Sequence, residues 1–410
     1  MNRFINSLCF LAITASLCFG YTINDVPEGW ASQGAGTTGG KGGEQVTVSN
    51  MSELKKEVGS SGKKIILVKP GTYSGSISFK SSDKSVLGIA PGVKIKGTMN
   101  IRGKNIIIRN IAIQDRGCNS YDKCKSGSDC VYIGGKGAEN IWLDHLDISD
   151  GMDGNLDITR GPDNITITWT KFSYSSKSKP HAFSNLIAGS DGESVSRGRL
   201  NMTYAYCWWA DNVVERMPRG RFGKIHVLNN LYTSKRTNYC CGSGHEMKML
   251  IEKNAFLCGG IAVRSIGKPP FNWKCVDNIG TARGINKSNG DGFVPPYTIK
   301  KFEASEVEAK VRAAAGNTMT LGETDIQNIN NSKVSNTLKP FLHISNRGWI
   351  LKNPCNQKYS LQILTFNGKV LHSSINIDAK GILEIPRYPS ALIIMFNNKN
   401  ISSIYVPLGF

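Results

Sequence analysis

The stretch "NIWLDHLDIS", Asn140 to Ser149, is a short β-rich segment of a kind that recurs along the chain. It mixes an apolar run with brief alternation, as the strands of a stacked parallel sheet do. Similar segments start about 24 or 36 residues apart, which is a solenoid period, and they read "NIIIRNIAI" at Asn105, "NITITWTKFSY" at Asn164, "RLNMTYAYCWW" at Arg199, "KIHVLNNLYT" at Lys224 and "MKMLIEKNAF" at Met247. No amphipathic helix of crossover length separates them, which disfavours a doubly wound βαβ fold. The repeat predicts an all-β, right-handed parallel β-helix, with a flat β-sandwich as the second choice.

Helical signals flank the repeats. "SELKKEVGS", from Ser52, predicts a helix that caps the N-terminal end of the solenoid. After the repeats, Ser305 and Glu308 have the spacing of a capping box, and Gly316 closes the apolar pattern behind them. We therefore expect a second helix that begins at the capping box.

The 410 residues divide into three parts. Residues 1–20 have an early arginine, an apolar run and then small residues, which is typical of a secretory signal peptide. Residues 21–344 hold the predicted β-helix. Residues 345–410 alternate tightly, contain the hairpin signal Asn367-Gly368, and carry seven Lys and Arg against two acidic residues. We interpret this tail as a small basic β module for export or attachment, or else as a cap of the solenoid.

The net charge of +19 limits the possible partners. Loss of Arg3 with the signal peptide would lower it to +18, because one of the 50 Lys and Arg is removed. A strongly basic exported protein is expected to meet a polyanion. Nucleic acid is disfavoured, because the signatures of nucleic-acid-binding folds are missing. A membrane span is not expected either. On charge alone, an acidic polysaccharide and an anionic envelope surface both stay open as partners of this secreted protein, which we expect to be a monomer.

Three aspartates form a candidate metal site. In "DGMDGNLDITRGP", Asp153 and Asp157 are four residues apart, where a turn leads into a strand. Asp129, in "SDCVYIGG", lies one predicted coil earlier and could stack beside them. Several carboxylate oxygens suit Ca²⁺, with water completing the shell. Taken alone, such a pair is more often a loop-capping aspartate beside a solvated one.

An arginine cluster follows two coils later. "NVVERMPRGRFGK" places Arg216, Arg219 and Arg221 within six residues. A solvated basic surface is one interpretation. Guanidinium groups and carboxylates on successive coils of one solenoid face would instead form a charged cleft for an anionic chain.

These segments resemble the core motifs of the pectate lyase family, polysaccharide lyases of parallel β-helix fold, from about Gly29 to Asn317. The resemblance implies that Asp153, Asp157 and the preceding Asp129 bind Ca²⁺. In the family pattern R-x-P-x-x-R it implies that Arg216 is the base and that Arg221 binds a substrate carboxylate. The expected reaction is calcium-dependent β-elimination of polygalacturonate. A pectin lyase for methyl-esterified chains and a non-catalytic polysaccharide-binding β-helix stay as alternatives, as does Arg216 as an electrostatic clamp with water as the base.

One departure from the family pattern concerns substrate binding. Where the family often has a lysine, in a motif like H-D-K-T-M-L-I-G, this chain has "HAFSNLIAG" with Phe183 at the lysine position. Lys177 or Lys179, in the loop "SSKSKP", could supply the missing charge. We expect His145 to be structural, because alternation would pack it between coils.

Overall fold

The computed structural model describes residues 19–120, 123–124, 128–176, 178 and 181–322, and strand segments between 341 and 405. The chain divides into two compact units, Met1–Ile329 and Asn330–Phe410. The signal-peptide prediction falls almost wholly outside the described residues. Among the residues that are described, no helix has the length and apolar character needed to cross a membrane.

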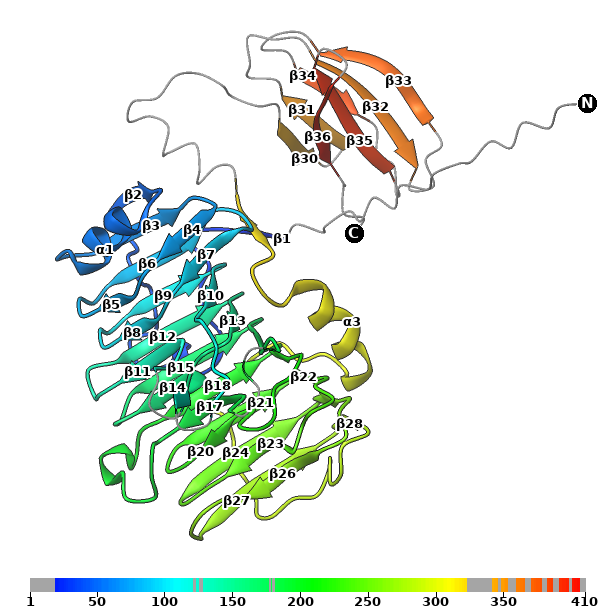
Figure 1. Ribbon diagram of the computed structural model, residues 1–410. Coiled ribbons are helices and arrows are strands. Elements are labelled where there is room, and N and C mark those ends of the chain that lie inside the picture. Colours follow the sequence, from blue (N-terminus) through cyan, green and yellow to red (C-terminus); the bar gives the residue numbers. More distant parts are fainter. Residues whose placement is uncertain are drawn as a thin grey trace, which may run out of the picture. The chain divides into compact units, whose positions relative to one another are not determined.

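Three parallel sheets form the first unit, and each turn of the chain adds one strand to each sheet (Figure 1). The ten-stranded sheet contains β2 (Glu44–Val48), β3 (Lys64–Val68), β6 (Lys84–Gly88), β9 (Ile106–Arg109), β12 (Glu139–Asp144), β15 (Asp163–Thr168), β18 (Asn201–Ala205), β21 (Lys224–Leu228), β24 (Met247–Glu252) and β27 (Phe271–Val276). The eight-stranded sheet contains β5 (Ile77–Phe79), β8 (Met99–Ile101), β11 (Val131–Gly134), β14 (Gly154–Thr159), β17 (Phe183–Ile187), β20 (Arg219–Gly220), β23 (Tyr239–Ser243) and β26 (Ile261–Ser265). The nine-stranded sheet contains β4 (Gly71–Ser74), β7 (Val93–Lys96), β10 (Ala112–Gln114), β13 (Asp147–Ser149), β16 (Lys171–Ser173), β19 (Trp208–Trp209), β22 (Leu231–Tyr232), β25 (Ala255–Phe256) and β28 (Ile279–Gly280).

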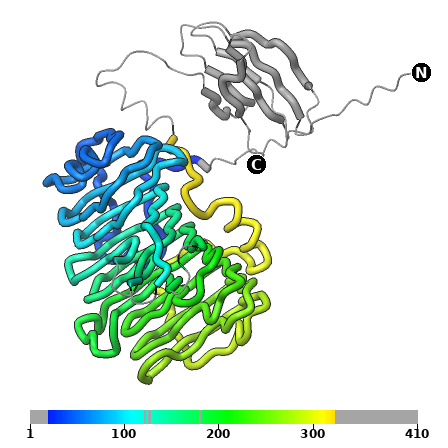
Figure 2. The backbone as a smooth tube through the Cα atoms, viewed as in Figure 1, coloured from blue at the N-terminus to red at the C-terminus, as the bar shows by residue number. Residues whose placement is uncertain are grey.

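This arrangement confirms the predicted parallel β-helix. The six recurring segments supply six consecutive strands of the ten-stranded sheet, β9, β12, β15, β18, β21 and β24. Their inward residues stack in register, so that Ile141 lies between Ile106 and Ile165, and all three are fully buried. Each such side chain contributes about 1.5–3 kcal/mol of burial free energy. The solenoid is therefore held together by apolar ladders that run along its axis. Figure 2 shows the backbone coils stacked one upon another.

Both flanking helices are present. Helix α1 (Met51–Gly59) lies at the N-terminal end, where the Asn50 side chain caps it by accepting a hydrogen bond from the Glu53 amide at 3.0 Å. Helix α3 (Ala304–Ala314) was expected to begin with a box of Ser305 and Glu308, and this is wrong. The capping box is formed by Glu303 and Glu306, because the chain becomes helical directly after Glu303.

The remaining elements of this unit are short. Strand β1 (Phe19–Tyr21) pairs in parallel with β29 (Met319–Leu321), so the two ends of the unit share a two-stranded sheet. Two 3₁₀ helices span Gly29–Ser32 and Ser194–Ser196. A disulfide joins Cys118 to Cys124.

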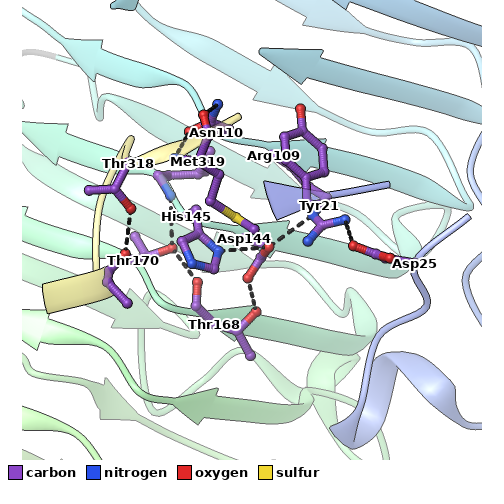
Figure 3. Close-up of polar contacts among 12 residues, drawn as sticks. Tyr21, Asp25, Arg109, Asn110, Asp144, His145, Thr168, Thr170, Thr318 and Met319 are labelled. Carbon is purple, nitrogen blue, oxygen red and sulfur yellow. Dashed lines mark hydrogen bonds and ion pairs between the residues drawn. The ribbon is translucent and has the colours of Figure 1, made fainter. Parts of the chain in front are cut away.

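A buried ionic cluster ties the N-terminal segment to the coils (Figure 3). Arg109 donates to Asp25 and to Asp144, both at 2.8 Å, and His145 Nδ1 lies 2.9 Å from Asp144 Oδ2. Burial alone would raise the pKa of Asp144, but the charges of His145 and Arg109 hold that pKa well below its usual range. His145 is 6% exposed and stacks on Trp169, which fits the structural role expected for it.

The second unit is an antiparallel β module. It contains β30 (Phe341–Ser345), β31 (Gly348–Lys352), β32 (Tyr359–Thr365), β33 (Val370–Ile377), β34 (Ile382–Ile385), β35 (Ala391–Asn397) and β36 (Asn400–Tyr405). They form sheets in the orders β30-β31-β34 and β33-β32-β35-β36. Strands β32 and β33, on either side of Asn367-Gly368, pair antiparallel as expected, although these two residues lie outside the described part. Since β30 pairs with β31, the unit extends N-terminally beyond residue 345.

Candidate active site

The eight-stranded sheet brings two of the three candidate aspartates together. Asp157 lies in β14, and Asp129 lies two residues before the neighbouring β11. A Cβ atom placed on Gly154 would lie 2.9 Å from Asp157 Oδ1 and 3.0 Å from Asp129 Oδ1. Both oxygens therefore border the same small space beside Gly154, where a larger residue would crowd the two carboxylates.

The electrostatics of this space favour a cation. Burial, followed by the charges of Asp157 and Asp153, raises the pKa of Asp129 to about 9. Burial also raises the pKa of Asp157, to about 7, although the Arg216 charge opposes the shift. Asp129 Oδ1 is buried, and no described residue hydrogen-bonds to it. Two desolvated carboxylates with an unsatisfied oxygen fit a hard divalent cation, which would relieve their repulsion.

Asp153 stands slightly apart from this pair. Its Oδ1 lies 3.5 Å from His181 Nε2, and its side chain is 33% exposed. In the described part of the chain, no three His, Cys, Asp or Glu side chains converge as a finished metal site. A cation held by Asp129 and Asp157 would thus need further oxygen ligands, from Asp153 after a side-chain rotation, from water or from a bound anion.

Arg216 lies beside the aspartates on an aromatic ring. Its backbone is left-handed, with φ of +64°, and its guanidinium carbon is 4.6 Å from the centre of the Phe183 ring. Phe183 is held by strand pairing with Gly154, and Tyr174 donates a 2.6 Å hydrogen bond to its carbonyl. Among the described residues, none hydrogen-bonds or ion-pairs with the Arg216 guanidinium, and its Nε is buried without a partner. Arg216 is partly exposed, so its Nη atoms, rather than the buried Nε, are the nitrogens open to a bound molecule.

The other two arginines differ from Arg216. Arg221 is only 6% exposed, and its Nε and Nη1 donate to Asp191 at 2.5 Å and to the Ala188 carbonyl at 2.7 Å. Arg219 lies in β20, and burial and the Arg221 charge lower its pKa. A substrate carboxylate at Arg221 would have to use Nη2 or compete with Asp191.

Sequence reasoning missed several of these partners. Asp191 lies in a turn after β17, and no spacing motif links it to Arg221. Phe183 was singled out only as a departure from the family pattern, not as the support of Arg216. Lys177 and Lys179 lie outside the described residues, so their proposed roles stay predictions.

The comparisons with known proteins agree with this fold. A family model described as pectate lyase matches residues 10–276. Pectate lyase plyB of Emericella nidulans is 34% identical over 286 residues, which cover 67% of this chain and 81% of that protein. A pectate trisaccharide-lyase of Thermotoga sp. strain RQ2 is 32% identical over 249 residues, 57% of this chain and 65% of its own length.

Solved structures show the same architecture. A pectate lyase bound to a hexasaccharide superposes with a TM-score of 0.60 at 21% identity, over 75% of this chain and 99% of that one. At this identity the likeness concerns the fold, which is that of the parallel β-helix lyases. Together with the family model and the sequence relatives, it leads to a plain conclusion: this chain belongs to the pectate lyase family.

Proposed function

We propose that the chain is a secreted, calcium-dependent pectate lyase that cleaves polygalacturonate by β-elimination. The observation that carries this proposal is the meeting of the Asp129 and Asp157 oxygens around Gly154, beside an Arg216 that no described residue engages. Family membership supports the reaction class. The signal-like sequence of residues 1–20 supports secretion.

Asp129 and Asp157, with Asp153 nearby, are the residues that would hold Ca²⁺. When bound, Ca²⁺ supplies positive charge that stabilises the negative charge developing on the substrate carboxylate. Asp129 Oδ1, which has no hydrogen-bond partner among the described residues, and the space beside Gly154 support the binding of Ca²⁺ there.

In this proposal, Arg216 acts on the proton at C5 of the sugar. The C5–H electrons would form the C4=C5 double bond while the bond from C4 to the glycosidic oxygen breaks. That oxygen would leave with the electron pair of the broken bond and take a proton from water, and the C5 proton would go to Arg216. A guanidinium group is normally protonated in proteins. Only its neutral form could accept the proton, so this role favours alkaline conditions. In the alternative in which Arg216 is an electrostatic clamp, Arg216 holds the substrate carboxylate and water or hydroxide takes the C5 proton.

Two other functions are less well supported. A lyase for methyl-esterified pectin has no need of carboxylate ligands for a cation, whereas this chain places Asp129 and Asp157 together in a buried site. A non-catalytic binding protein would use the same unpaired arginine to hold a carboxylate, but membership of the pectate lyase family supports a catalytic role instead.

A direct assay tests the proposal. The purified protein is incubated with polygalacturonate at pH 8–9, and the ultraviolet absorbance of the unsaturated product is followed with Ca²⁺ and with excess chelator. We expect product with Ca²⁺ and at least about 100-fold less with chelator, because the charge stabilisation is lost. Highly esterified pectin, tested in parallel, distinguishes the pectin lyase alternative. Full activity in chelator would refute the calcium assignment.

The C-terminal β module should be dispensable for catalysis. A chain that ends at Ile329 removes the second unit and leaves the site residues in place. Because each unit forms its own sheets, we expect a soluble protein whose kcat stays within about twofold of the full chain. Activity and the melting temperature of the first unit are the measurements. A truncated protein that fails to fold would favour the interpretation of the module as a cap.

Phe183 should matter for turnover through Arg216. Phe183→Leu removes the ring on which the guanidinium lies and keeps an apolar side chain in place. Since a partly desolvated cation–aromatic contact contributes about 1–2 kcal/mol, we expect kcat to fall about five- to thirtyfold. Phe183→Tyr, which keeps the ring, should retain most of the activity.

The matched control for Phe183 is Phe302→Leu, which removes a ring below Lys310 near α3. Steady-state kinetics with saturating Ca²⁺ would give kcat and KM separately. Equal kcat values for Phe183→Leu and the native protein would show that Arg216 needs no support from this ring.

A further inference from the structure

A second aromatic side chain lies beside the aspartates, and the reaction described above does not use it. Tyr132 of β11 is directly opposite Asp157 in the parallel register of β11 and β14. Its hydroxyl is 2.9 Å from the Thr159 hydroxyl. A Cβ atom on Gly134 would lie only 2.2 Å from Tyr132 Cε1, so the ring lies against the backbone of its own strand. Tyr132 is thus a partly exposed ring, held flat on the sheet.

A cation accompanies this ring from the preceding coil. Arg102 directly follows β8, and its guanidinium carbon is 5.4 Å from the centre of the Tyr132 ring. Arg102 is exposed, and none of the described carboxylates lies within ion-pair distance of it. Exposed cation–aromatic contacts are weak, so an incoming anion can draw the guanidinium away from the ring.

We propose that Tyr132 and Arg102 form a subsite for a galacturonate unit next to the one at the aspartates, displaced by one coil toward the N-terminal end. The apolar face of the sugar would lie on the Tyr132 ring, and its carboxylate would pair with the Arg102 fork. Neighbouring strands are about 4.8 Å apart, and a pyranose unit is of comparable length, so a chain along the solenoid axis reaches both places. This inference rests on the proposed function and adds to it the residues that bind a longer substrate.

Kinetics on substrates of different length test the subsite. Tyr132→Leu keeps an apolar side chain over Gly134 but removes the flat ring, and Arg102→Ala removes the charge. Each should raise KM for polygalacturonate about tenfold and leave kcat within about twofold, because the lost contacts serve binding. The shortest oligogalacturonate that is cleaved does not need this subsite, so its KM should change less in both variants.

The control is Arg312→Ala, which removes a guanidinium that lies 5.2 Å from the Trp208 ring of the nine-stranded sheet. It should leave KM unchanged. Melting temperatures establish that each variant is folded. If Tyr132→Leu does not fold, the KM of Arg102→Ala for polygalacturonate tests the subsite on its own. Unchanged KM values for polygalacturonate in folded variants would overturn the subsite while leaving the lyase assignment intact.

If the native protein does not cleave polygalacturonate, the proposed function fails separately from the subsite. Binding of polygalacturonate in affinity electrophoresis then takes the place of kinetics. Weaker retardation of Tyr132→Leu and Arg102→Ala than of Arg312→Ala would support the subsite. Equal retardation of all three would overturn it.

Discussion

Arg216→Lys is expected to lower kcat on polygalacturonate about 100- to 1000-fold at alkaline pH with Ca²⁺ present, which is the range for loss of a positioned base. Lysine keeps a positive charge but is shorter and lacks the planar fork. Because the lost interaction belongs to the transition state, KM should change by less than about threefold. Turnover near the native level in Arg216→Lys would reduce Arg216 to an electrostatic clamp.

Arg221→Lys provides the contrast, since Arg221 lies in the same cluster but already donates to Asp191 and to the Ala188 carbonyl. Its replacement by the shorter lysine weakens the ion pair with Asp191 and removes the hydrogen bond to the Ala188 carbonyl. We therefore expect a lower melting temperature and a higher KM, with kcat less affected than in Arg216→Lys. The two variants separate proton transfer from substrate placement in a single set of kinetic and thermal measurements.

The fold could be predicted because its strands repeat. Ile106, Ile141 and Ile165 occupy equivalent places in their segments, and the structure stacks them in one ladder. The same periodicity correctly placed Asp129 one coil before Asp157. Periodicity works here because every coil meets its neighbour in the same way.

Contacts made by loops could not be predicted in this way. Asp191 meets Arg221 across 30 residues of chain because the turn after β17 happens to fold over it. Phe183 supports Arg216 because the segment before β20 has a left-handed backbone at that residue. The helix start at Glu303 rather than Ser305 has a similar origin, since it depends on where the preceding loop leaves the chain. Such features follow from the path of individual loops, which vary from coil to coil.

Asp157→Asn should abolish calcium-dependent activity and at the same time stabilise the metal-free protein. The buried Asp157 carboxylate has a pKa of about 7, against 3.8 as its ordinary value. Between these pH values the folded protein holds a proton that the unfolded chain has lost. Stability is therefore greatest at acidic pH and falls as the pH rises toward the folded pKa. Asparagine has no charge to bury, so this loss disappears.

We expect the metal-free Asp157→Asn protein to melt at least about 3 °C above the metal-free native protein at pH 9, with a smaller difference at pH 4. Ca²⁺ should raise the melting temperature of the native protein, because a ligand that binds only the folded state stabilises it. Ca²⁺ should raise the melting temperature of the Asp157→Asn variant much less, since one of the two carboxylates that border the Gly154 space is gone. Asp163→Asn, which changes an aspartate at the start of β15 on another sheet, is the control and should keep the calcium response. A variant with lost activity but no gain in metal-free stability would mean that the carboxylate is well accommodated without a cation, which would contradict the site proposed here.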